Sequence, residues 1–209
     1  KSNYQQENRN LEVVKKEVIP QKEVDSLFIL EREIIRILLL YGNEEANFID
    51  VVEVEDEEGN ITEKDEKHKN TVSTELYLNL QDDEIEFANP VFKSIYYEAI
   101  HQLNQSEKIV IEEFVNHKNQ EIASMVTSIL MDDEKYALSD WQRKNIYVTE
   151  PVEILSKLVS DSILNIRRIL IDKKIDDLMN NHKEDKNVQL DLNLVKEYIG
   201  LKTRLFDKL

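Results

Sequence analysis

The sequence predicts an all-α protein, in which a helical bundle is joined by one long helix to a C-terminal helical hairpin. Only three Gly and three Pro occur among the 209 residues, so few positions interrupt a helix. The chain is instead rich in Leu, Ile, Glu and Lys, a composition that favours helices. Residues 151–181 contain no Gly and, after Pro151, no further Pro, and they keep a helical pattern throughout.

This long helix is predicted to extend beyond the bundle. A helix over 151–181 would be about 45 Å long, whereas a small domain is only about 30 Å across. Its second half should therefore project as an arm. A polar turn over 182–187 and a second helical stretch over 188–209 follow, and we expect the last helix to fold back on the arm. Residues 150–209 thus form the second part of the molecule.

The last helix carries two apolar stripes. Together they cover about 200° of its surface, roughly twice the apolar face of an ordinary surface helix. One stripe can pack on the long helix, and the other needs the body of the domain or another protein. The first stripe consists of Val188, Leu192, Val195, Ile199 and Phe206, and the second of Leu190, Leu194, Tyr198, Leu201, Leu205 and Leu209.

Residues 21–149 are predicted to form the bundle, after a loosely ordered lead-in over 1–20. Asn89 and Pro90 suit the N-cap and the first position of a helix, and Gly42 suits a helix end. An irregular connection over 132–148 should follow the last bundle helix, with Trp141 either clamping it to the bundle or acting as a binding platform. The predicted bundle helices are 21–41, 71–81, 90–103, 109–115 and 121–131.

The negative charge of the chain is concentrated in one segment. Sixteen Asp or Glu and three Lys lie between Glu44 and Glu86, which gives this segment −13 of the total net charge of −16. Within it, 48–54 is rich in Val and Ile, so the insertion at about 43–70 is either an acidic loop or a small β-hairpin. No basic patch is visible, and direct tight binding of nucleic acid is not expected.

The sequence contains no recognisable catalytic chemistry. It has no Cys, and its four His lie far apart without the spacing of metal ligands. The carboxylates of 81–84 and 132–134 are interpreted as solvated helix ends. No apolar run is long enough to span a membrane, which together with the lack of Cys favours a cytoplasmic protein. The polar, Met-less start suggests a fragment that opens with a linker, and we expect no cofactor or metal in it.

Four segments resemble one protein family in their order and spacing, over about residues 21–209. They are 30–40 (LEREIIRILLL), 87–96 (FANPVFKSIY), 138–141 (LSDW), and 163–178 (ILNIRRILIDKKIDDL) followed by 201–209 (LKTRLFDKL). These segments look like the C-terminal helicase-binding domain of bacterial DNA primase. The resemblance implies that the parent protein synthesises RNA primers with zinc and magnesium held in domains absent from this fragment. The fragment itself would be a non-catalytic docking module.

In that family the C-terminal hairpin binds the amino-terminal region of the hexameric replicative helicase. The second apolar stripe would then supply the contacts, from Leu194, Tyr198, Leu201, Leu205 and Leu209, with Lys202 and Arg204 at the rim. In some members a basic pocket also takes the acidic tail of the single-strand DNA-binding protein, and Arg32 is the matching position. The alternative to a binding role is that Arg32 and Arg36 are solvated charges that pair with Glu31 or Glu33.

Two other functions are compatible with the residues. The spare stripe could be buried in a homo-oligomer, which would make this a structural domain, whereas a docking module should be a monomer or weak dimer alone. The bundle could also hold a metal-dependent enzyme site that the sequence does not reveal. Buried carboxylates with perturbed pKa values would mark such a site.

Overall fold

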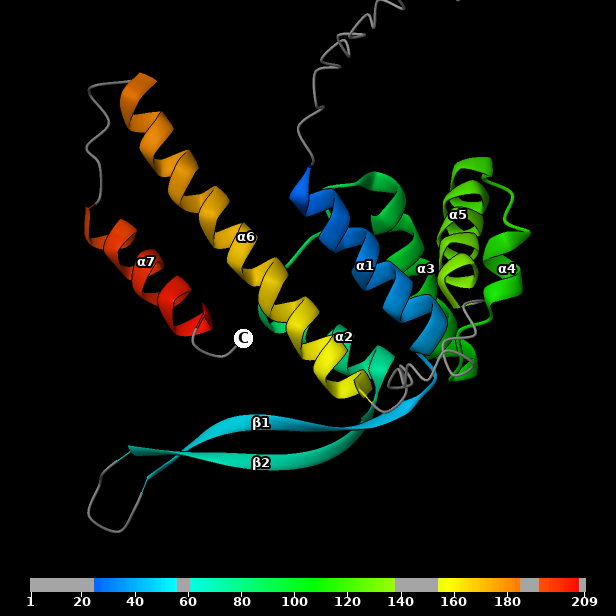
Figure 1. Cartoon of the computed structure of the whole chain (residues 1–209), viewed down its shortest axis with the longest axis horizontal. Coiled ribbons are helices and arrows are strands. Elements are labelled where there is room, and N and C mark those ends of the chain that lie inside the picture. The colour runs from blue at the N-terminus through cyan, green and yellow to red at the C-terminus, as the bar shows by residue number, and fades with distance from the viewer. Residues whose placement is uncertain (1–24, 56–60, 138–153, 185–191, 207–209) are drawn as a thin grey trace, which may run out of the picture.

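A computed structural model describes residues 25–55, 61–137, 154–184 and 192–206. It confirms the all-α fold with a small β-hairpin insertion. The described part contains seven helices and one two-stranded antiparallel sheet (Figure 1).

The lead-in over 1–20 and the connection around Trp141 lie outside the described residues. The elements are α1 (Ser26–Tyr41), β1 (Glu45–Glu55), β2 (Ile61–Thr71), α2 (Val72–Asp82), α3 (Pro90–Ser106), α4 (Ile111–Val115), α5 (Gln120–Ala137), α6 (Leu155–Glu184) and α7 (Leu192–Phe206).

The core lies between α1, α2, α3, α5 and the first half of α6. α1 is its central element, since it packs against the other four. Tyr96 packs against Phe87 with ring centroids 5.2 Å apart, and burial raises the pKa of Tyr96 to about 12. The fully buried side chains include Ile34, Ile35, Leu38, Leu76, Phe92, Ile95, Ile129, Leu155 and Val159.

The residues predicted to begin or end helices are found at helix termini. Asn89 caps α3 by accepting hydrogen bonds from the backbone N–H groups of Val91 and Phe92, and Pro90 opens the helix. Gly42 ends α1 without a positive φ. A Cβ at Gly42 would lie 2.7 Å from Ile109 Cδ1, so the absence of a side chain allows the α3–α4 loop to approach. Asn43 fastens the same loop through two hydrogen bonds to the backbone of Ile109.

Several predicted boundaries were wrong, and α3 ends at Ser106 instead of residue 103. α5 continues to Ala137 instead of ending at Met131, because Asp132 and Asp133 form ion pairs with Arg32 and Arg36 of α1 and tie the extra turns to the bundle. α6 continues through Glu184, so the first half of the polar stretch 182–187 is helical and not a turn. Neither Gly nor Pro interrupts that stretch, and polarity alone does not end a helix.

The acidic insertion is a β-hairpin. β1 and β2 pair in continuous register from Glu45↔Thr71 to Glu55↔Ile61. Its base is part of the core, where Phe48 is buried. The hairpin leaves the bundle beside the start of α6 and extends away from it (Figure 1).

α6 and α7 form the predicted arm. The first half of α6 is buried against α1 and α2, whereas no residue from Asp172 to Asn180 is buried. α7 packs against α6 and lies beside its far half (Figure 1). No described helix is both long enough and apolar enough to cross a membrane.

Candidate protein-docking site on the C-terminal hairpin

The seam between α7 and α6 runs along the boundary between the two predicted stripes. Val195 is buried there, and Tyr198 and Lys202 are half-buried. Lys202 Nζ forms an ion pair with Asp172 Oδ1 of α6 at 2.5 Å. These three positions lie within about 60° of one another on the helix, at roughly 100° per residue. α7 therefore rests on α6 along a narrow line and not along one whole stripe.

As a result, each stripe keeps an uncovered flank. On one side of the seam Leu192 is 60 % exposed and Ile199 is 49 % exposed. On the other side Leu201 is 37 % exposed, and Leu194 and Leu205 are half-buried. The sequence predicted that one stripe would be covered and the other free. The structure divides the exposed apolar surface between both sides of α7.

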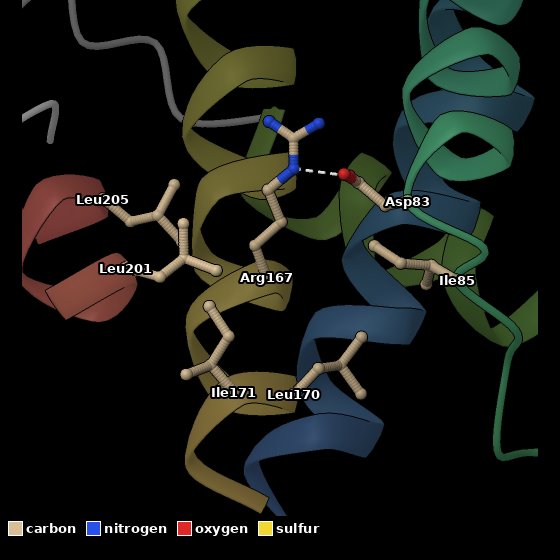
Figure 2. Close-up of a pocket in the computed structure, with 7 residues that line it drawn as sticks. All are labelled: Asp83, Ile85, Arg167, Leu170, Ile171, Leu201 and Leu205. Atoms are coloured by element: carbon tan, nitrogen blue, oxygen red, sulfur yellow. Dashed lines mark hydrogen bonds and ion pairs between the residues drawn. The ribbon is translucent and has the colours of Figure 1, made fainter. Parts of the chain in front are cut away.

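The flank with Leu201 faces a groove between α7, α6 and the end of α2. Figure 2 shows Leu201 and Leu205 of α7 on one side and Asp83 and Ile85 on the other, with α6 between them. The groove has a volume of about 460 Å³. It is lined by Asp83, Ile85, Arg167, Leu170, Ile171, Leu201 and Leu205.

An ion pair fixes the polar part of the groove. Arg167 donates from Nε to Asp83 Oδ2 and from Nη2 to Asn79 Oδ1 at 3.1 Å (Figure 2). Both charges are therefore matched within the chain. The remaining lining is aliphatic, so this groove is suited to apolar side chains of another protein and offers no unpaired catalytic group.

The end of α2 positions Ile85 by a local backbone motif. Glu84 adopts a left-handed conformation with φ 53°, and the backbone N–H of Ile85 returns to Leu80 O at 2.9 Å. This is a Schellman-type ending, which turns the chain back over the helix end. Because of it, Ile85 lines the groove although its sequence neighbours are acidic.

The structure brings some of the predicted contact residues together. Leu201 and Leu205 share the groove, and Arg204 is exposed on the outer face of α7. Lys202 is not a free rim charge, because it pairs with Asp172. Leu209 lies outside the described residues. Ile85 and Arg167 were not predicted as site residues, and the only signal for Ile85 was an isolated Ile within an acidic stretch.

Arg32 does not lie in a basic pocket. Its Nη2 atom is 2.6 Å from Asp132 Oδ2, and it also donates to Ser128 Oγ. One turn further on, Arg36 pairs with Glu33 and Asp133, and its hydrogen bond to Glu33 raises the pKa of the guanidinium above its usual value. An acidic peptide tail at Arg32 would have to displace the Asp132 carboxylate.

The two acidic clusters have structural partners. Asp83 pairs with Arg167, and Asp132 with Arg32, so these carboxylates are not merely solvated helix ends as predicted. Within 25–55, 61–137, 154–184 and 192–206, no three His, Asp or Glu residues converge as metal ligands.

The fold and the groove define a helical protein with an exposed hairpin surface. The chain belongs to the family described as Domain of unknown function (DUF8430), whose model matches residues 18–205. Neither the curated proteins nor the solved structures include a match to this chain.

Proposed function

We propose that this chain is the docking module of a DNA primase and that it binds the replicative helicase through the α6–α7 hairpin. The exposed apolar surface of α7 carries this proposal. On the groove side, Leu201 remains 37 % exposed and Leu194 and Leu205 remain half-buried after α7 has packed on α6. Such a surface on a small helical element is typical of a protein interface.

The kind of partner follows from the resemblance to the primase family. The segments that carry it include 163–178 and 201–209, which belong to α6 and α7. A helicase is therefore the expected partner, and the complex would act at the replication fork in the cytoplasm. The chain contributes binding and position to primer synthesis, not catalysis.

The groove favours an apolar side chain of the partner as the bound group. A partner side chain placed between Leu201, Leu205 and Ile85 would be surrounded by aliphatic groups from three elements of this chain. Removing that area from water stabilises the complex by roughly 25 cal/mol per Å². An apolar anchor of this kind typically loses at least about 2 kcal/mol when it is truncated.

The direct test is the substitution Leu201→Asp, measured by calorimetry against the amino-terminal region of the cognate helicase. We expect roughly thirtyfold weaker binding or complete loss, since a carboxylate in the groove would have to be desolvated. Leu201 is a better choice than Tyr198, because Tyr198 is half-buried and its truncation could also loosen α7. Circular dichroism should show an unchanged helical content.

Two variants test whether a new negative charge at any exposed apolar position weakens binding. Ile199→Asp places the same charge on the other flank of α7, and Ile29→Asp places it on α1, where the residue is 51 % exposed. Both should retain most of the affinity. Loss in Ile199→Asp alone would move the contact to the other flank, whereas full binding by all three variants would contradict docking through the hairpin.

Self-association is the competing use of the same surface. Leu192 and Ile199 are seven residues apart and both exposed, the spacing of a helix pair that buries one seam. Sedimentation of the free chain distinguishes the two functions. The docking proposal expects a monomer or weak dimer, and a tight dimer lost in Ile199→Asp would identify a homo-oligomeric domain instead.

A further inference from the structure

The β-hairpin is anchored to the bundle at its base. Phe48 is buried and stacks on His68 with ring centroids 5.9 Å apart. The buried carboxylate of Glu75 on α2 contacts His68 Nε2 at 3.0 Å and accepts a hydrogen bond from Asn70 Nδ2 at 3.3 Å. The direction of the hairpin is therefore set by the bundle.

Beyond this base the two strands continue as a ribbon. Each strand has eleven residues, and the described sheet consists of these two strands alone. Eleven residues span about 36 Å at the usual rise of an antiparallel strand. β1 contacts α6 near its base, and beyond that contact each strand presents an outer edge of backbone N–H and C=O groups to which a further strand can be added (Figure 1).

The two edges differ in charge. β1 carries Glu45, Asp50, Glu53 and Glu55 and no basic residue, whereas the three Lys of β2 balance its three carboxylates. Repulsion between carboxylates opposes pairing of β1 with a second copy of itself. The same charges attract a strand that carries Lys or Arg, and they exclude the phosphate backbone of a nucleic acid.

The distal part of β1 also has the residues of a strand that pairs well. Val51, Val52 and Val54 are β-branched, and such residues favour the extended backbone conformation. An added strand that alternates basic and apolar residues would match both properties of β1 along the ribbon.

We propose that the outer edge of β1 binds an extended, Lys- or Arg-rich segment of another protein by strand addition. Backbone hydrogen bonds to the edge provide the pairing, and the carboxylates of β1 select a basic partner. This interaction is independent of docking through α7, because it uses β1, which lies beside the start of α6, whereas α7 lies beside its far half (Figure 1).

A short peptide in which Lys and Val alternate is the probe. We expect it to bind the full chain and to slow hydrogen exchange at the β1 amides. A peptide of the same charge with Pro in place of Val cannot supply the backbone donors at those positions. It should bind roughly tenfold more weakly and leave the exchange of β1 unchanged.

The matched variants are Glu53→Lys with Glu55→Lys on β1, and Glu63→Lys with Asp65→Lys on β2, which change the net charge equally. The β1 variant should bind the Lys–Val peptide roughly tenfold more weakly, and the β2 variant should lose less. Equal binding of the two peptides, or equal loss in the two variants, would show attraction to net charge alone and overturn the proposal. Protection confined to β2 would overturn it as well.

Discussion

Glu31 shows how one buried charge organises the bundle. Its side chain is 1 % exposed, and its two carboxylate oxygens accept hydrogen bonds from the backbone N–H groups of Ala88 and Asn89. These donors immediately precede α3, where Ala88 is exposed and Asn89 is half-buried. Glu31 therefore joins α1 to the start of α3, and through the Asn89 cap it helps to fix where α3 begins.

We expect Glu31→Ala to destabilise the fold by about 2–3 kcal/mol, because it removes two hydrogen bonds to a charged carboxylate that joins α1 to the start of α3. Urea unfolding followed by circular dichroism measures this change. Glu86→Ala is the control, since the Glu86 side chain is 70 % exposed and its ion pair with Lys93 lies at the surface. That variant should stay within about 0.5 kcal/mol of the unmodified chain. Equal stability of the two variants would contradict the assigned role of Glu31.

At the scale of elements, α7 contains a Gly in its interior, Gly200, for which the structure gives no packing reason. A Cβ built at Gly200 meets no atom within 4 Å, so no close approach within the described chain requires Gly there. A Gly in a helix interior is about 1 kcal/mol less favourable than Ala.

Gly200→Ala should therefore stabilise α7 by about 1 kcal/mol, which would appear as slower hydrogen exchange of its amides. Helicase affinity should not change, because residue 200 lies on the outer face of α7, away from Leu201 and the groove. Weaker helicase binding in this variant would instead indicate that the partner backbone approaches α7 at this position.

Local sequence predicted the elements better than their contacts. α2 could be located from its apolar spacing, and α3 from its apolar spacing together with Asn89 and Pro90 at its start. The extent of β2 could not be predicted, since its Lys and Glu residues favour no strand. β2 forms because it pairs with β1 and because Glu75 holds its end. The end of α5 depends on Arg32 and Arg36, about a hundred residues away in sequence.

The candidate site was predictable only in part. The helical spacing of α7 identified Leu201 and Leu205 as an apolar pair, and the structure places both in one groove. The helical spacing alone could not show which part of this broad apolar surface of α7 would contact α6. The ion pair between Lys202 and Asp172 lies on that line of contact and joins α7 to α6.

At the scale of the whole molecule, the bundle should stay folded without the arm, whereas the arm should depend on the packing of α7 against α6. The bundle holds most of the buried core, whereas the far half of α6 has α7 as its neighbour (Figure 1). A single helix without tertiary packing is marginal in water.

Deletion of 182–209 should leave the bundle folded but allow the far half of α6 to unfold. The loss of helical signal in circular dichroism should then exceed the share of the deleted residues, and proteases should cut between 172 and 181. Resistance of this segment in the shortened chain would show that α6 is stable without α7. Loss of the thermal transition of the bundle would contradict the division into two parts.

The unbroken course of α6 also makes it a lever. Its first turns touch α1, α2 and the base of β1, and its other end carries α7. The part of α6 from residue 172 onward is about 20 Å long, so a tilt of about 10° where it leaves the core displaces its tip by about 3–4 Å. A force applied to α7 therefore acts on the packing of α6 at the base of the β-hairpin. Two proteins bound at these two distant places would influence each other through α6.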